Sequence, residues 1–469
     1  MNSSPSVPSM PLIKFHSRSM GLKLLVVCAL ALLMTIPALF VMGLVTDRTK
    51  RAAEVVQQIS SYSGGQQTFL GPTLAIPYKL PPQASTGLAR RDPYLIFPTV
   101  ASGVLKTTTE ERRRSLFKVP VFRADIKLDG AFDLTAAPTA GLQDAELDWS
   151  RAEIVVGVSD ARGALADATL AADGKTTVLV PAELTPDIPI AGDPSGRKLT
   201  FFGARFDAIA KPNTKFDVTA SLRFSGAQRI AVLSYGKTTR MTAQGDWPSP
   251  GFDGGFLPVR RTVSKNGFTA EWSVPFIARG VGAEGPSDSF AGLPATSLGT
   301  SFIEVADPYQ SVNRSLKYVL LFLGLIFLSY FVFEVMTGKR VHPAQYLLVG
   351  IAQIIFYLLL LSLSERMGFD WGFLVAGGAT VTLLSANAGW VFESRLQAAR
   401  ALATFTMLYV VIYLLLRMED NALLVGAIAS FVAVAATMYL TRKIDWYGSP
   451  GAASAVEQLG LAPAPKDAS

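Results

Sequence analysis

Uncharged apolar stretches and one long polar stretch divide the chain. A helix needs about 20 apolar residues to cross the core of a bilayer. Two of the apolar runs in this chain are shorter, and they reach this length only when a charged residue at one end is counted as part of the helix. Including them, six stretches qualify, at 20–45, 318–336, 343–364, 371–392, 399–416 and 421–441. The pattern predicts six transmembrane helices, of which the first is an uncleaved signal anchor and the other five form a bundle over 318–441.

The polar stretch at 46–317 has a different period. Residues 46–61 keep a helical pattern that continues the first span out of the membrane, and the pair Gly64-Gly65 ends it. Beyond these glycines, apolar side chains recur at every second position, most clearly over residues 216–224. The pairs Asp173-Gly174 and Asn266-Gly267 indicate tight hairpins. Many strands with almost no helical signal predict a sandwich-like β-domain.

The expected fold class is therefore an α+β membrane protein, with a large β-rich domain inserted between transmembrane helices 1 and 2. Residues 1–12 and 448–469 are rich in small residues and proline near the ends of the chain, which favours disorder in both termini. The domain boundaries are a terminus at 1–19, helix 1 at 20–45, the β-domain at 46–317, the bundle at 318–441 and a tail at 442–469.

Lysine and arginine near the span ends predict the orientation, because loops on the cytoplasmic side carry an excess of both. With both termini in the cytoplasm, nine basic residues flank the spans on that side, at positions 14, 18, 23, 339, 340, 395, 400, 442 and 443. The short loops on the other side hold only Arg366 and Arg417. The sequence thus predicts a multi-pass protein of the bacterial inner membrane with a periplasmic β-domain.

Composition excludes several kinds of site. Cys28 is the only cysteine, and the two histidines, His16 and His342, both flank predicted spans. An intramolecular disulfide or a cysteine-rich zinc site is therefore excluded, and we expect no metal or cofactor. The net charge of +7 combines the cytoplasmic basic residues with 31 basic and 27 acidic residues interspersed over 46–317. We expect the lipid bilayer and an envelope polymer or protein as partners, and no nucleic acid.

No motif predicts an enzyme. Residues 231–238 approach a phosphate-binding loop, but Ala231 stands at the position of its first glycine, so a hairpin turn is the favoured interpretation. No serine-nucleophile elbow and no zinc-protease motif is present. The basic run Arg112-Arg113-Arg114 indicates a solvated loop, or else a contact with anionic lipid or envelope polymer.

Several motifs resemble those of the CreD family of inner-membrane proteins. They are Met20-Gly21-Leu22-Lys23, Gly64-Gly65-Gln66-Gln67, Trp247-Pro248-Ser249-Pro250, Gly254 to Pro258, Arg314 to Tyr318, Phe333-Glu334, His342 to Gly350, residues 361–365 and residues 441–447. The likeness runs from about residue 18 to residue 447. It implies a Gram-negative inner-membrane protein linked to cell-envelope integrity, in a regulon under a two-component system. The family's molecular activity is undefined, so it supplies no catalytic residues.

The candidate functional residues come from these motifs and from the few polar positions in the predicted bundle. Glu334 is ionisable and sits near the end of a predicted span, where its carboxylate reaches either the interface beside Lys339 and Arg340 or an internal site. The full set is Glu334, His342, Gln345, Tyr346, Trp247, Phe256, Arg314, Asp445 and Trp446.

Three functions follow from this pattern. The first is a non-enzymatic envelope-integrity factor whose periplasmic domain binds an envelope component or partner. The second is a transporter or a membrane-embedded lipid-processing enzyme, with Glu334, His342 and Gln345 lining a pocket that faces the cytoplasm. The third is a modulator of two-component signalling.

Overall fold

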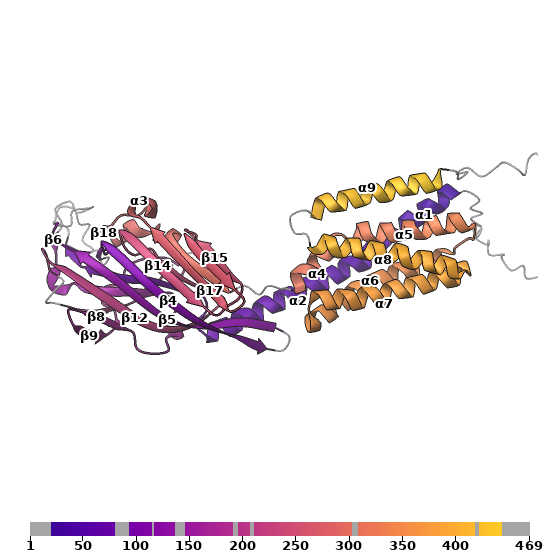
Figure 1. Cartoon of the computed structure of the whole chain (residues 1–469). Helices are drawn as coiled ribbons and strands as arrows, with labels where there is room; N and C mark the ends of the chain where they lie inside the picture. Colours follow the sequence, from indigo (N-terminus) through magenta and orange to yellow (C-terminus); the bar gives the residue numbers. More distant parts are fainter. Residues whose placement is uncertain are drawn as a thin grey trace, which may run out of the picture. The chain divides into compact units, whose positions relative to one another are not determined.

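The computed structural model describes residues 20–79, 93–114, 117–136, 146–190, 196–206, 211–302, 308–417 and 422–442. The chain divides into two compact units. The helical unit comprises the chain up to Lys50 and from Ala306 onward, and the β-domain comprises Arg51–Val305. The predicted α+β architecture, with a β-rich region between a first helix and a set of C-terminal helices, is confirmed (Figure 1).

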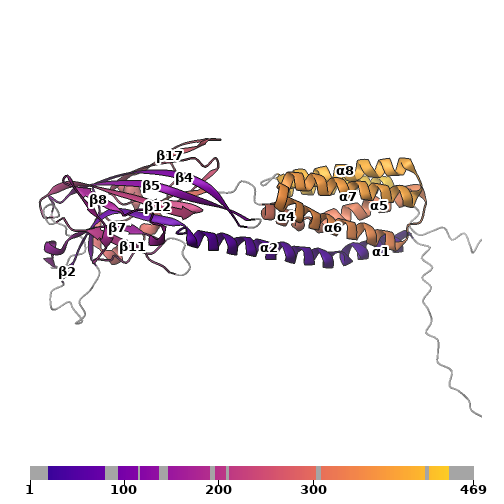
Figure 2. The same cartoon turned by 90° about the horizontal axis from the view of Figure 1, so that it is seen from below.

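The helical unit is built from helices that lie side by side, most of them apolar (Figure 2). In chain order they are α1 (Met20–Leu33), α2 (Thr35–Tyr62), α4 (Pro308–Lys317), α5 (Val319–Thr337), α6 (Pro343–Met367), α7 (Phe369–Phe392), α8 (Arg395–Arg417) and α9 (Ala422–Thr441). In the described part of the chain, five helical segments are long and apolar enough to cross a membrane, with α1 and α2 counted as one. The apolar part of α9, Leu424–Tyr439, is shorter. The number of six spans stays a prediction.

Pro37 explains why the first helix is interrupted. A proline has no backbone N–H, and its ring clashes with the carbonyl of the residue four positions earlier. That residue is Leu33, where α1 ends, and α2 begins at Thr35. The Thr35 hydroxyl donates to the Leu32 carbonyl at 2.6 Å, so it satisfies one of the backbone groups at the interruption. Helix α2 then runs on to Tyr62 and is followed by Gly64 and Gly65, both at positive φ, as the sequence predicted.

Two mixed sheets and a small third one make up the β-domain. The larger sheet has nine strands. Its order is β10 (Val180–Pro181), β11 (Thr200–Ala204), β7 (Glu153–Val158), β1 (Gln67–Ile76), β13 (Arg229–Leu233), β19 (Ser297–Phe302) and β15 (Pro250–Gly254), while β3 (Tyr94–Ile96) pairs with β1 and with β18 (Glu284–Pro286). The small sheet pairs β2 (Tyr78–Lys79) with β6 (Glu146–Leu147).

The second sheet has eight strands and carries the surface that matters below. Its order is β16 (Arg260–Ser264), β17 (Gly267–Val274), β14 (Thr238–Gly245), β4 (Val100–Arg114), β5 (Phe117–Asp133), β12 (Lys215–Ala227), β8 (Thr169–Ala172) and β9 (Lys175–Val178). Along β12 buried and exposed side chains alternate, so one face of this sheet packs into the core and the other is open. Apolar side chains from both large sheets form one core cluster, which is the arrangement of a sandwich.

Short helical segments complete the β-domain. The one α-helix among them is α3 (Phe276–Arg279), and Gly280 at a φ of 66° ends it. Its last residue, Arg279, is only 2% exposed, and its side chain donates to the carbonyls of Ser234 and Gly282 at 3.0 and 2.8 Å. Burial lowers the pKa of Arg279 to about 10. These bonds tie the end of α3 to the segment that joins β13 to β14.

Three local predictions need correction. Residues 231–238 do not form a hairpin, because β13 and β14 belong to different sheets and the segment between them crosses the core. The hairpin at 264–267 exists, but its turn residues are Lys265 and Asn266, and Gly267 already pairs in β17. The run at 112–114 lies in strand β4 instead of a loop.

Candidate functional site

Glu334 is enclosed inside the helical unit. It lies in the last turn of α5, three residues before the end of a helix that is otherwise uncharged, and only 2% of its surface is exposed. The helix ends at Gly338, whose N–H donates to the Glu334 carbonyl at 3.0 Å and whose φ of 66° suits a glycine. The nearby Lys339 pairs with Glu393 instead, at 2.8 Å. The carboxylate of Glu334 therefore points to an internal site and not to the interface.

Three donors from three segments satisfy this carboxylate. Lys23 of α1 forms an ion pair with Oε1, and the backbone N–H of Val341 donates to the same oxygen at 2.9 Å. The Tyr346 hydroxyl of α6 donates to Oε2 at 2.9 Å. The side chain of Lys23 is 21% exposed, so its stem passes along apolar neighbours while its head reaches the buried acid. We call Lys23, Glu334 and Tyr346 the charged centre.

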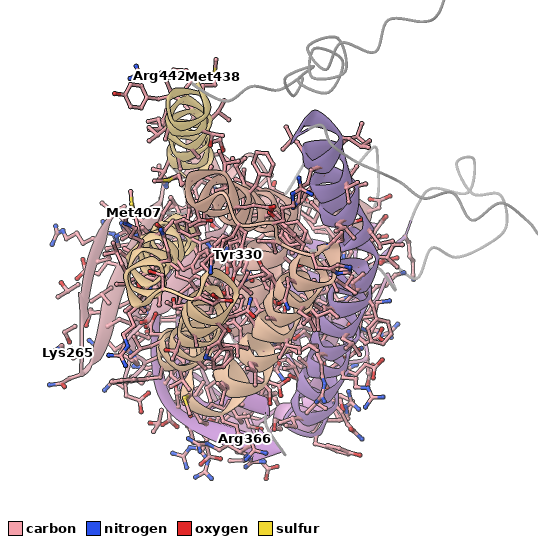
Figure 3. All side chains as sticks on the ribbon, turned by 90° about the vertical axis from the view of Figure 1, so that its right-hand side faces the viewer. Lys265, Tyr330, Arg366, Met407, Met438 and Arg442 are labelled. Atoms are coloured by element: carbon pink, nitrogen blue, oxygen red, sulfur yellow. The ribbon has the colours of Figure 1, made fainter. Side chains whose placement is uncertain are left out.

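A second set of polar side chains lies next to the charged centre. The rings of Tyr346 and Tyr330 meet edge to face at 6.3 Å. The Tyr330 hydroxyl donates to the Leu384 carbonyl at 2.8 Å and accepts from the Asn387 side chain at 3.1 Å, so it connects α5 to α7. Figure 3 shows Tyr330 inside the bundle, whereas Met407 and Met438, 66% and 69% exposed, point away from it. Polar contacts thus link four helices across the unit.

Further along α6, Gln353 occupies another buried polar position. Its Oε1 accepts from the Tyr409 hydroxyl of α8 at 3.1 Å. Neither the Gln353 side chain nor that of Tyr357, one turn on, is exposed by more than 1%. Of the tyrosines in this unit, the sequence singled out Tyr346 but not Tyr330, Tyr357 or Tyr409, because a tyrosine at a helical spacing is more often part of an apolar core.

Among the candidate residues near the charged centre, Tyr346 joins Glu334 and the others do not. His342 is exposed and caps the start of α6, where its Nδ1 accepts from the Ala344 N–H at 3.1 Å. Gln345 is half-buried, and none of the contacts to the Glu334 carboxylate among the described residues comes from it or from His342. The structure thus groups Glu334 with Lys23 and Tyr346 instead of with His342 and Gln345.

The remaining candidates lie elsewhere. Arg314 is half-buried on α4, and Asp445 and Trp446 fall outside the described residues. Trp247 packs edge to face on Phe302 at 6.4 Å, and the Phe256 carbonyl accepts from the Trp272 indole N–H at 3.1 Å. Trp247 and Phe256 thus anchor the segment on either side of β15 to the core of the β-domain.

This anchored segment presents apolar side chains to solvent. Leu257, Val259 and Val263 are 68%, 69% and 49% exposed, although their neighbours in the sequence are held to the core. Leu257 and Val259 precede β16, and Val263 belongs to it. β16 is the edge strand of the eight-stranded sheet, and all five of its residues are exposed. We call Leu257, Val259 and Val263 the apolar edge. Sequence patterning did not find it, since single exposed apolar residues are common on protein surfaces.

A groove of about 390 Å³ lies beside the apolar edge on the open face of the sheet. Strands β4, β14, β17 and β16 provide its lining, and these strands are neighbours in the sheet (Figure 1). Its polar lining includes Arg240, Arg260 and Glu271, its hydroxyl groups come from Ser102, Thr242 and Ser273, and Val104 and Val259 add apolar surface. The charges that could act on a ligand here are two guanidinium groups against one carboxylate.

Glu153 is a buried acid in the β-domain, so we asked whether its carboxyl group could be catalytic. Burial raises the pKa of Glu153, which is 3% exposed, and such a shift can mark a functional site. Its Oε2, however, accepts from the backbone N–H groups of Glu183 and Leu184 at 3.1 and 3.2 Å. Glu153 therefore holds the chain after β10 in place, and among the described residues no group of three or more metal-ligating side chains is present.

The comparisons with known proteins identify a family of inner-membrane proteins. The family model described as Inner membrane protein CreD matches residues 19–447. The chain is also similar to the protein named Inner membrane protein CreD from Escherichia coli (strain K12). The two are 31% identical over 430 residues, which cover 89% of this chain and 91% of the relative.

Proposed function

Because the chain belongs to the CreD family of inner-membrane proteins, we propose that it maintains cell-envelope integrity by binding and not by catalysis. In this proposal the bundle anchors the protein in the inner membrane. The β-domain is periplasmic and binds an envelope component or a partner protein there. The distribution of lysine and arginine around the apolar helices supports this orientation, with both termini in the cytoplasm.

The apolar edge is the observation that carries the proposal. Exposed apolar side chains grouped at one edge of a folded domain mark a site of interaction. Here the segment that carries them is held in place, because the Phe256 carbonyl accepts from the Trp272 indole N–H at 3.1 Å and the Val259 N–H donates to the Glu271 carbonyl at 2.8 Å. The adjoining groove gives the same surface polar and charged groups that can select a ligand.

Photocrosslinking in living cells tests this surface. With a photoreactive amino acid at Leu257 or Val259 of the full chain, we expect adducts of defined size, because these side chains face the bound component. The measurement is the yield of adducts on denaturing gels from cells grown under envelope stress.

The same sheet provides the control position. Lys175 is exposed on β9, the strand at the opposite edge of this sheet from β16. We expect adducts there to be several times less abundant than at Leu257. Equal yields at Lys175, or none at Leu257 and Val259 in folded protein, would count against the proposal.

The charged centre motivates a second candidate, a transporter or membrane-embedded enzyme. An ionisable group inside a bundle of apolar helices is a candidate for function by default. Against this reading, both oxygens of Glu334 already have protein donors. The Glu334→Gln variant, tested for both stability and rescue, separates the two roles.

A further inference from the structure

The open face of the eight-stranded sheet is not uniform in charge. On β5 and β12 several exposed cations face acids: Arg223 pairs with Asp125 at 2.7 Å, and Lys215 pairs with Asp133 at 2.8 Å. The basic run of β4 is also compensated, since Arg112 pairs with Glu110 at 3.0 Å. Most of the face is thus neutralised by its own side chains.

Arg240 in the groove differs from these residues. Its cross-strand neighbours are Ser102 on β4 and Ser273 on β17, and no carboxylate of the described residues lies within ion-pair distance of it. Glu271 of β17 lies opposite Arg260 of β16, and the two side chains form an ion pair at 3.7 Å. A guanidinium surrounded by hydroxyl groups presents its donors to solvent, and its planar fork matches a carboxylate in two parallel hydrogen bonds.

The backbone under the groove indicates what kind of ligand fits. Strands β4, β14 and β17 are interior strands, so their N–H and C=O groups are used in the sheet ladder. A peptide that adds a strand would have to pair with β16, the edge strand beside the groove, and not with these interior strands. Recognition on the face itself uses side chains, and those present are hydroxyls, two guanidinium groups, one carboxylate and two valines. This set suits the hydroxyls, carboxylates and C–H surfaces of an acidic sugar.

We propose that the groove around Arg240 binds a carboxylate-bearing saccharide polymer of the cell envelope. Arg240 holds a carboxylate, Ser102, Thr242 and Ser273 bond to sugar hydroxyls, and Val104 and Val259 pack against the ring C–H faces. This rests on the proposed function, because it names the envelope component that the β-domain binds.

Titration of the purified full chain in detergent with oligogalacturonate, which carries one carboxylate on each sugar, tests the proposal. Binding is followed by calorimetry. Arg240→Gln is expected to weaken the affinity about tenfold or more, the range for a charge-assisted pair, and Arg240→Lys should weaken it less. Arg223→Gln is the matched control, since that arginine lies on the same face outside the groove, and it should leave the affinity unchanged.

Two further ligands make the outcome decisive. The methyl ester of the same oligomer keeps the sugar and loses the charge, so it should bind at least about tenfold more weakly. Equal binding of the ester, equal binding by Arg240→Gln, or no binding of oligogalacturonate overturns the proposal. Oligoglutamate that binds as tightly and with the same dependence on Arg240 assigns the groove to an acidic peptide instead. Crosslinks from Leu257 that persist in any of these cases show that the proposed function stands without this ligand.

Discussion

Lys23→Met is expected to lower the stability of the helical unit by about 3–5 kcal/mol, the range for breaking a buried ion pair. The variant removes the cation that faces Glu334 and leaves that carboxylate, 2% exposed, among apolar helices with the Val341 N–H and the Tyr346 hydroxyl as donors. Thermal unfolding of the purified full chain in detergent measures the loss.

The reverse change should be milder. Glu334→Gln leaves Lys23 without its acid, but the Lys23 side chain is 21% exposed and can turn its ammonium group toward water. We expect a loss smaller than that of Lys23→Met. The double variant Lys23→Met/Glu334→Met leaves no charge unpaired. Its stability should be close to that of the parent protein, because apolar replacement of both partners of a buried ion pair is often neutral.

The same unit contains the control pair. Lys339 and Glu393 form an ion pair at 2.8 Å with side chains that are 43% and 80% exposed. Removing either should change the free energy of unfolding little, as expected for a solvated pair. A loss at Lys23 no larger than the loss at Lys339 would contradict the assignment of a buried charged centre.

Glu334→Gln also decides between anchoring and a chemical role of the bundle. If Glu334 only holds α1, α5 and α6 together, rescue of an envelope-stress phenotype should follow the amount of folded protein. Loss of rescue at normal expression and near-normal unfolding temperature would favour the transporter or enzyme instead.

Gly71→Ala is the second change with a large expected effect, on the β-domain. A Cβ at Gly71 would lie 2.5 Å from the ring of Tyr235, which is fully buried. The Tyr235 hydroxyl lies 2.6 Å from the Ser102 carbonyl and 3.0 Å from the Asp129 carbonyl, so this ring ties the nine-stranded sheet to the eight-stranded one. Burial raises the pKa of this hydroxyl well above its usual value and keeps it a donor.

The added methyl group forces either β1 or the ring to move, and we expect a loss of about 2–4 kcal/mol from overpacking and a weakened hydrogen bond. Gly292→Ala is the control, because no atom lies within 4 Å of a Cβ there. Near-UV circular dichroism during thermal unfolding measures both. Placing Tyr235→Leu in the Gly71→Ala background should cost less than the sum of the two single changes. Strict additivity would show that the ring is not the obstacle.

The charged centre shows how far sequence reasoning reaches in the helical unit. The apolar runs located the helices, because a span needs a fixed number of apolar residues. Glu334 stood out as an acid in such a run, but the nearest cations in the sequence were Lys339 and Arg340. Its actual partner is Lys23, which lies 311 positions away and which the sequence explained only as a basic flank of the first span. Periodicity carries no information on which helices become neighbours.

The β-domain shows the same limit. Alternation identified strands such as β12, because a half-buried strand repeats every two residues. It could not assign strands to sheets, so residues 231–238 were expected to form a hairpin although β13 and β14 belong to different sheets. Arg240 likewise had no distinguishing mark, since its serine neighbours come from strands far apart in the chain.

The sequence by itself determined the class of the protein, its apolar helices, the β-rich insertion between them and the family. These follow from local composition and period, which act over one element at a time. The tertiary structure alone decided the Lys23–Glu334 pair, the apolar edge and the groove around Arg240. Each of these depends on side chains brought together from distant segments, and only the packing of helices and the register of strands fixes such distances.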